Sequence, residues 1–566
     1  MNSYPLINIR LFTAVIFCAY TQNNIWAQNN EKKWMLNGNF QTNTQFFDRD
    51  DAIGANTLVY RKQKSSNESW LFTKLNYGDW NFSLRYDLFN NSPLLNPQGA
   101  YSNQGLAFYQ ISKDIDNLNI TVGHFYDQFG SGSLFRSYED RNIGIDYAIR
   151  GARLKYNFND KIYLKAFTGQ QRGDIENRFG VFEDRIQGLN LEGDFNLLKN
   201  KKLKFLPGAS VVNKTHSEKT MNRVAAEINS YKNIDDRFAN PKYNTFGFNA
   251  YATLNYGNFT LNGEYCHKTL DLIRDLSLLF RNRGGDVYYG TLSYGVSGIN
   301  NKWLKSFGAN IQYKKIDKFE FRINPYASNL DGFISYLPSI TRANTYRLLA
   351  RYTAVVQTIG DEAIQGDVTF GISENTNLNF NYSNVRSLAF NGDAAGKPIQ
   401  LFEELYAQIE HTFNKKWKGK FGLQKIFYNQ ERYEFKPGAI NVTTFTPFTE
   451  LTFKYQRKKS FRFEFQYLET KQDLGSFLNA VLEWNIAPKY SFSITDMINT
   501  KPYRSPGSSI PNRVIHYPTV FASYTLKASV FTLAYIKQVQ GVNCTGGICR
   551  VEPAFSGIRF TMNSNF

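Results

Sequence analysis

The sequence contains few of the residues that support metal, redox or nucleophilic chemistry. Only 4 of its 566 residues are cysteine and only 5 are histidine. The histidines stand far apart, without the spacing of metal ligands: His124, His216, His267, His411 and His516. A hydrolase would need a serine or an aspartate close to a histidine in space, which separation in the sequence does not exclude. His124 is the histidine to test for such a catalytic role. We therefore expect no enzyme activity, no cofactor and no metal site.

Long apolar segments are also missing beyond the N-terminus. A helix needs about 20 consecutive apolar residues to span a bilayer, and the mean hydropathy of -0.44 agrees with their absence. A helical membrane protein is thereby excluded. Aromatic residues, in contrast, make up 16% of the chain, with 48 Phe and 36 Tyr. Outer-membrane β-barrels use such residues in girdles at the two membrane interfaces.

The N-terminal segment has the order of a cleavable export signal. Arg10 precedes an apolar run over residues 11–20, and Ala27 offers a cleavage point. The apolar run is too short to span a bilayer as a helix. We expect residues 1–27 to be a signal peptide and residues 28–566 to form a single outer-membrane β-barrel domain.

The few cysteines and the basic charge bear on compartment and partners. Cys544 and Cys549 flank four residues in the last long loop, where a disulfide would fit an oxidising compartment; free thiols are the alternative. The formal net charge is +18, but the basic residues are dispersed rather than gathered in one patch, so we expect no nucleic-acid partner. We expect them to face anionic lipid and lipopolysaccharide at the membrane surface, or to attract anionic solutes into a lumen.

Apolar and polar residues alternate with a period of two along the whole chain. In the cleanest example, residues 80–88, the apolar face alternates with Asn81, Ser83, Arg85 and Asp87. This is the pattern of a strand with lipid on one face and a polar lumen on the other. Tight turns such as Gly78–Asp79 alternate with long polar segments, as in bacterial barrels with periplasmic turns and outward loops.

This alternation predicts an all-β fold, a large antiparallel transmembrane β-barrel with structured extracellular loops. The strand number should be even, about 20 to 24, because both termini then lie on the periplasmic side. Apolar residues at helical spacing recur within residues 216–231 and 272–280. Helices there would bury their apolar faces against the barrel mouth or in the lumen, or would cap an extracellular loop.

The last strand ends on an aromatic residue and resembles the closing strand of a Gram-negative outer-membrane barrel. In such barrels this strand is recognised by the barrel-assembly machinery, which we therefore expect as a partner in the cell outer membrane. The strand should pair with the first strand near Trp34. Its lipid-facing residues are expected to be Ile558, Phe560, Met562 and Phe566.

Charged residues are dense between positions 126 and 153. The candidates for a lumen charge cluster are Arg136, Glu139, Asp140, Arg141, Arg150 and Arg153. Such a cluster would select or gate a solute. The structural alternative is a salt-bridge network that fills the barrel and stabilises it.

Two motifs support a family resemblance. The first contains residues 128–132, Gln-Phe-Gly-Ser-Gly, followed by Arg136, Tyr138-Glu139 and Arg141; the second contains Thr345-Tyr346, Tyr352, Gln357 and Glu362. Together they resemble a family of Bacteroidota outer-membrane β-barrel proteins, porin-like and of unassigned function. The resemblance implies a fold and a membrane, but no established chemistry.

Two functional hypotheses follow. The first is a porin-like channel for small polar or anionic solutes, because barrels with many strands leave a lumen. The second is a plugged scaffold or accessory barrel subunit of an outer-membrane secretion, assembly or uptake complex, favoured by the apolar loop segments. Conductance across a planar bilayer distinguishes them.

Overall fold

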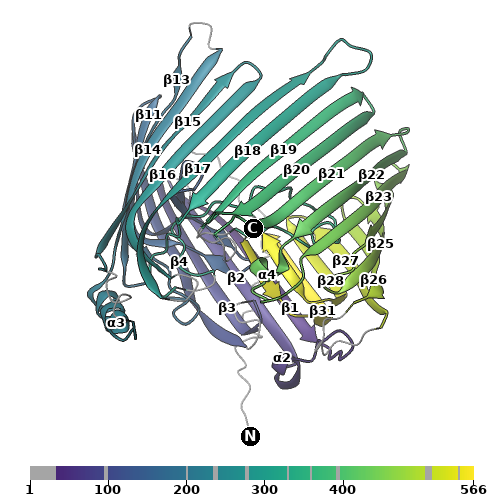
Figure 1. Ribbon diagram of the computed structural model, residues 1–566, viewed down its shortest axis with the longest axis horizontal. Coiled ribbons are helices and arrows are strands. Elements are labelled where there is room, and N and C mark those ends of the chain that lie inside the picture. Colours follow the sequence, from purple (N-terminus) through teal and green to yellow (C-terminus); the bar gives the residue numbers. More distant parts are fainter. Residues whose placement is uncertain are drawn as a thin grey trace.

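The chain folds into a closed cylinder of antiparallel strands with loops inside it (Figure 1). The computed structural model describes residues 34–94, 100–198, 202–233, 240–274, 279–327, 330–356, 360–389, 396–503, 513–545 and 548–566. The expected signal peptide lies outside the described residues.

The wall strands follow one another around the barrel in chain order. The first half comprises β1 (Trp34–Phe47), β2 (Ser65–Tyr77), β3 (Trp80–Ser92), β4 (Tyr101–Ile115), β5 (Leu118–Phe125), β10 (Ile149–Asn159), β11 (Ile162–Gln171), β12 (Arg185–Gly193), β13 (Phe195–Asn196), β14 (Leu203–Thr215), β15 (Asn244–Tyr256), β16 (Phe259–Arg274), β17 (Phe280–Ser297) and β18 (Ser306–Asp317). The second half comprises β19 (Gly360–Ser373), β20 (Thr376–Ser387), β21 (Gln400–Thr412), β22 (Trp417–Tyr428), β23 (Val442–Gln456), β24 (Lys459–Leu468), β25 (Gly475–Ile486), β26 (Tyr490–Pro502), β27 (Ile515–Leu526), β28 (Ser529–Gln538) and β31 (Phe555–Asn565).

Smaller elements lie in the connections between wall strands. They are the helices α2 (Leu58–Lys62), α3 (Glu218–Asn229) and α4 (Gln430–Tyr433), and the short strands β6 (Asp127–Phe129), β7 (Phe135–Ser137), β8 (Glu139–Asp140), β9 (Ile145–Asp146), β29 (Gly541–Thr545) and β30 (Ile548–Glu552).

The barrel closes with an even number of strands. Of the 25 strands in the sheet, β12 and β13 are separated only by Asp194 and both pair with β14. Counted as one, they leave 24 wall strands. β31 pairs with β1, from Asn39 opposite Asn565 to Phe47 opposite Gly557. The predicted antiparallel barrel and its even strand number are confirmed.

Turns and loops separate to opposite rims, as the sequence predicts. Tight turns such as residues 78–79 and 257–258 lie at one rim, and α2 and α3 lie with the long connections at the other (Figure 1). We call these the short-turn rim and the long-loop rim.

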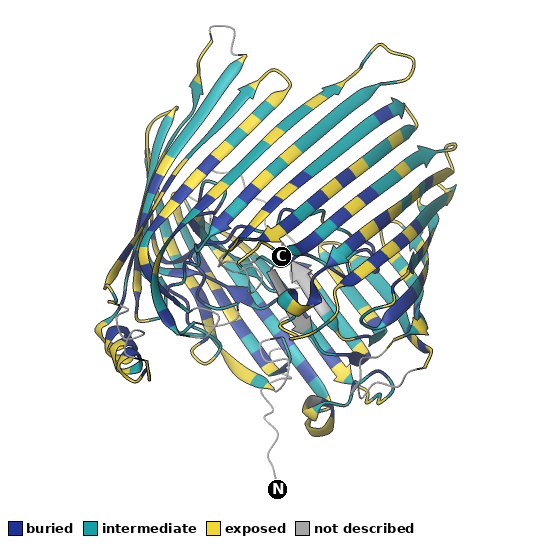
Figure 2. Ribbon diagram, in the orientation of Figure 1, coloured by how far each residue is buried: buried dark blue, intermediate teal, exposed yellow. Residues whose placement is uncertain are grey.

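The outer wall surface is apolar and the inner surface polar. Exposed and less exposed residues alternate along the wall strands (Figure 2). On β3, Leu84 and Tyr86 are 49% and 37% exposed, whereas Arg85 and Asp87 are 2% and 0% exposed inside the barrel. No helix among the described residues is long and apolar enough to span a membrane.

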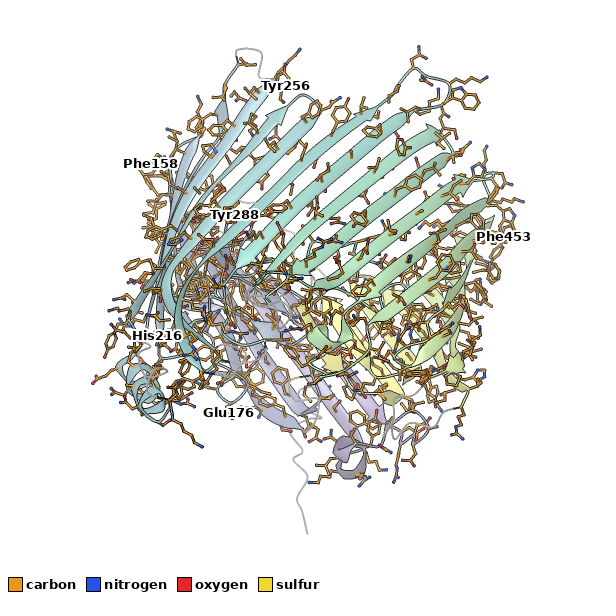
Figure 3. The ribbon with its side chains drawn as sticks, viewed as in Figure 1. Phe158, Glu176, His216, Tyr256, Tyr288 and Phe453 are labelled. Atoms are coloured by element: carbon orange, nitrogen blue, oxygen red, sulfur yellow. The ribbon has the colours of Figure 1, made fainter. Side chains whose placement is uncertain are left out.

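Aromatic rings form a girdle near the short-turn rim. The Trp34 and Tyr77 rings stack with centroids 4.2 Å apart, and the Trp417 and Phe453 rings stack at 4.5 Å. Figure 3 places Phe158, Tyr256 and Phe453 toward this end of the barrel and His216 toward the other. An apolar belt with an aromatic girdle is the surface that a bilayer requires of a transmembrane barrel.

Of the two segments predicted to be helical, the first contains a helix and the second does not. Within residues 216–231, α3 begins after Ser217, whose Oγ accepts a hydrogen bond from the Thr220 N–H, and it buries Val224 and Ile228. Around residues 272–280 the prediction is wrong, because β16 and β17 extend through both ends of that segment, with Arg274 opposite Phe280. The strand ladder satisfies the backbone there, and the apolar ends of both strands pack against α3.

Candidate functional site: the plug and the chamber beside it

Two connections fold back into the barrel and fill much of its lumen. We call them the plug: the hairpin segment, residues 126–148, and the crossing segment, residues 318–356 except for the undescribed 328–329. Phe129 and Phe135 of the hairpin segment pack on the inward ring of Phe167 in β11. Leu134, Phe321, Ile334 and Leu337 join the same buried cluster, with inward residues of eight wall strands from β5 to β18.

The glycine-rich motif forms the inward turn of the hairpin segment. Gly132 has φ +97, which a residue with a Cβ rarely adopts. The Gly132 carbonyl accepts a hydrogen bond from Tyr336 N (3.2 Å), and Arg136 N donates to Ile334 O (2.9 Å). Ser131 N donates to Glu264 Oε2 of β16 (2.9 Å). The motif therefore joins the hairpin segment to both the crossing segment and the wall.

The crossing segment then binds a second arc of the wall, from β21 to the connection after β24. Asn344 Nδ2 donates to Glu404 Oε1 (3.0 Å), and Tyr346 Oη donates to Glu450 Oε2 (3.2 Å). Leu348 N donates to Gln466 Oε1 at 2.8 Å. Tyr352 Oη donates to Asp473 Oδ2 at 2.9 Å. A single segment thus contacts inward side chains on two arcs of the barrel.

Buried lysines hold the start of the crossing segment. Lys214 on β14 and Lys268 on β16 both pair with Asp271, at 2.5 and 3.4 Å, and Lys268 Nζ also donates to the Glu320 carbonyl at 2.6 Å. The Lys214 ammonium lies 5.4 Å from the Phe321 ring centre. Each charge here has a partner, as burial requires.

The centre of the charge network on the hairpin side is Asp146. Its carboxylate pairs with Arg85 and Arg172 and accepts a hydrogen bond from Tyr126 Oη (2.9 Å). Burial opposes ionisation of Asp146, but Arg172 and Arg85 outweigh it and hold the pKa of that carboxyl well below its usual range. Arg85 also pairs with Asp87 and Glu139, both at 2.8 Å.

The six predicted charge-cluster residues do not form one cluster. Glu139 and Arg141 pair at 2.8 Å beside Arg85, whereas Arg153 pairs with Asp127 at 3.3 Å. Arg150 and Arg153 lie three residues apart on β10, so their side chains face opposite sides of the wall. The remaining two make local contacts: Arg136 stacks on Tyr138 (4.5 Å), and Asp140 accepts from Asn142 N (3.0 Å).

Sequence reasoning missed the residues that organise this network. Arg85 stood on the polar face of the clearest alternating strand, and Asp146 stood within the dense charged segment. The sequence therefore allowed an inward position to be predicted for Arg85 and Asp146. No pattern around Arg172 predicted that it would join them. Their meeting at one point depends on how the hairpin segment folds back.

A cavity of about 760 Å³ lies between the crossing segment and the closing seam of the barrel. We call it the seam chamber. Its wall is formed by inward residues of β1, β2, β26, β27, β28 and β31. Its charged lining residues are Glu68, Arg141, Arg347, Arg351, Glu552 and Arg559.

The closing strand β31 pairs with β1 at the seam. Ile558 is 44% exposed on the outer surface. Phe566 exchanges two backbone hydrogen bonds with Gly38, at 2.7 and 3.0 Å. A Cβ atom added at Gly38 would lie 2.3 Å from the Phe566 ring, so this ring covers the glycine. Recognition of the strand by the assembly machinery stays a prediction.

Cys544 and Cys549 lie in the last long connection of the chain, and His124 lies on β5. Cys544 lies opposite Cys549 in the β29–β30 ladder, and their disulfide stays a prediction. His124 accepts a hydrogen bond from Tyr109 N at 3.3 Å and packs edge-on against that tyrosine ring. No group of three or more His, Cys, Asp or Glu in the described ranges is placed to hold a metal.

The fold and the lumen define the class of this protein: a closed 24-strand barrel of the outer-membrane type, with its own loops inside. The chain belongs to a family of unknown function, DUF6029, whose model matches residues 6–566. No curated protein matches its sequence.

Three solved structures match almost the whole length of this chain at low sequence identity. The translocation pore of the P pilus usher PapC matches with a TM-score of 0.43 and 9% identity, covering 94% of this chain and 99% of that one. The siderophore receptor PirA from Pseudomonas aeruginosa matches with a TM-score of 0.42 and 8% identity, covering 95% and 81%. The copper transporter OprC matches with a TM-score of 0.41 and 9% identity, covering 95% and 81%.

Proposed function

We propose that this protein is an outer-membrane barrel of a Gram-negative bacterium whose own plug closes the lumen at rest. It works as a gated, accessory barrel of an uptake or assembly complex rather than as a permanently open porin. The short-turn rim and both termini face the periplasm, and the long-loop rim faces outward, where lipopolysaccharide surrounds it. A Bacteroidota source agrees with the motif resemblance.

The observation that supports a closed lumen is the path of the crossing segment. It starts among buried lysines at β14 and β16, packs on the hairpin segment and ends on Gln466 and Asp473. Moving it would expose buried rings and leave buried charges without partners, and each such group is costly. Opening therefore needs a partner or a ligand that favours the displaced state.

Planar-bilayer conductance of the purified protein tests the closed lumen. Wild type should conduct little, whereas replacing residues 338–352 by a short Gly-Ser linker should give a steady ohmic current. A milder variant, Tyr346→Ala with Tyr352→Ala, removes two wall contacts and should raise conductance partially. Tyr313→Ala is the matched control, because Tyr313 is exposed and bonds Glu362 within the wall.

Heat-dependent migration in detergent gels verifies that each variant is a folded barrel. A wild-type current as large and steady as that of the linker variant would contradict the closed lumen and favour the porin hypothesis.

A further inference from the structure

Several polar groups that line the seam chamber have no hydrogen-bond partner among the residues that the structure describes. The Arg347 side chain, on the crossing segment, forms no hydrogen bond or ion pair with any residue that the structure describes, and the same holds for Arg559 on β31. The Nε of Arg559 and the Oδ1 of Asn43 are buried without a hydrogen bond to any described residue. Protein interiors rarely leave such groups unsatisfied, so their partner is expected in the chamber itself.

The carboxylates near the chamber leave Arg347 without a neighbouring negative charge. Glu552 and Glu68 attract the Arg559 guanidinium electrostatically but form no ion pair with it. Arg351 pairs with Asp473 at 3.2 Å and Arg141 pairs with Glu139 at 2.8 Å, so both of those cations are accounted for. Glu68 accepts hydrogen bonds from neutral donors, Asn43 Nδ2 (2.8 Å) and Ser92 Oγ (2.7 Å). Glu552 accepts a bond from Gln538 Nε2 at 3.3 Å.

Arg347 has an unfavourable environment for its positive charge. Burial lowers the pKa of its guanidinium, and the neighbouring Arg351 lowers it further, with no carboxylate beside it to compensate. A bound anion would remove both penalties, because guanidinium groups bind carboxylate and phosphate oxygens through paired, charge-assisted hydrogen bonds.

We infer that the seam chamber binds a hydroxylated organic anion of the sugar phosphate or sugar acid class, held between Arg347 on the plug and Arg559 on the wall. The volume suits a small ligand. Beside the arginines, the amides of Gln41, Asn43, Gln45 and Gln538 line the chamber, and amides both donate to and accept from hydroxyl groups. The inference rests on the proposed function only because the closed plug supplies half of the site.

Isothermal titration of the full-length protein in detergent tests the site with four probes: glucose 6-phosphate, glucuronate, glucose and inorganic phosphate. At least one of the two sugar anions should bind in a one-to-one complex, and more weakly as ionic strength rises. Glucose should not bind, and inorganic phosphate should bind more weakly. Arg347→Gln and Arg559→Gln should each weaken binding by about tenfold or more.

Variants separate a specific site from general attraction to a basic protein. Arg150→Gln removes one positive charge from the outer face of β10, outside the lumen, and should leave the affinity for the sugar anion unchanged. Arg347→Lys keeps the charge without the paired donors and should bind with intermediate affinity. Arg347→Gln lies on the plug, so it remains informative if Arg559→Gln fails to assemble.

The inference is overturned if neither sugar anion binds at millimolar concentration, if inorganic phosphate binds as tightly, or if the Arg347 and Arg559 variants bind like wild type. The conductance experiment has an independent readout. A closed wild-type lumen without sugar-anion binding would overturn the chamber alone, and an open lumen would overturn the proposed function.

Discussion

The two sides of the lumen are built differently. Beside β5 to β18, the plug packs against the wall through a continuous apolar cluster and buried ion pairs. From β19 to β27 the crossing segment packs on the wall through a second buried cluster that includes Ile340, Leu348 and Tyr352. Only beside the closing seam does it leave the seam chamber. A plug that served only to fill the barrel would have no reason to leave a cavity of about 760 Å³ beside the closing seam.

The charges show the same division. On the packed side, Asp146 pairs with Arg85 and Arg172, and Asp271 pairs with Lys214 and Lys268. At the seam chamber, Arg347 and Arg559 form no ion pair with a described residue, although Glu552 and Glu68 attract the Arg559 guanidinium electrostatically. The paired charges fix the plug in place, whereas the charges without an ion-pair partner can bind a ligand.

The largest expected effect is the removal of Asp146 from the packed side. Asp146→Ala leaves Arg85 and Arg172 buried without their shared carboxylate, and losing one partner of a buried network costs about 3–5 kcal/mol. Thermal unfolding in detergent measures the loss. Asp51→Ala is the control, because Asp51 pairs with Arg49 in an exposed position and its loss should leave the melting temperature unchanged.

The pH dependence of the same variant has a defined sign. Because the pKa of Asp146 is lowered in the folded protein, its contribution is complete above the ordinary carboxyl pKa of 3.8 and is lost as the pH falls below that value. Wild type and Asp146→Ala should therefore approach each other in stability only at acid pH. A constant difference down to strong acid would show that the packed side does not depend on this charge.

The architecture of the wall could be predicted from the sequence because each strand carries its own signal. Arg85 and Asp87 face inward for the same reason that Leu84 and Tyr86 face outward, and this alternation needs no knowledge of neighbouring strands. The even strand number was predicted from the placement of both termini on one side of the membrane, and a closed barrel then requires the first and last strands to pair.

The site could not be predicted in the same way, because it depends on contacts across the lumen. Asp146 meets Arg172 only after the hairpin segment folds inward. Arg347 and Arg559 line one chamber whose sides come from distant parts of the chain. The helical spacing around Leu272 was misread because the apolar ends of two strands, both packed on α3, imitate one face of a helix.

A smaller effect is expected at the closing seam, beside the seam chamber. Gly38→Ala places a Cβ where the Phe566 ring lies, 2.3 Å away, so the ring must move, and such overpacking costs about 1–3 kcal/mol. Gly263→Ala on β16 is the matched control, since nothing lies within 4 Å of its added Cβ. Thermal unfolding of both variants, alone and with Phe566→Ala, measures the coupling. Equal destabilisation by both glycine variants would show that Phe566 does not close the seam through this contact.

The smallest expected effect concerns Asp331, a carboxyl on the packed side whose burial is not offset by its arginines. Burial raises its pKa to about 6, with Asp174 raising it further and Arg178 and Arg322 opposing both. Between pH 3.8 and about 6 a released plug carries an ionised Asp331 while a docked plug keeps it protonated, so docking weakens as the pH rises through this window and is constant above it. Plug opening, measured as conductance, should therefore be more frequent at neutral than at mildly acid pH, and Asp331→Asn should remove the difference. If the variant keeps the full pH dependence, another group controls docking, and the division between a fixed side and a ligand-binding side has to be redrawn around that group.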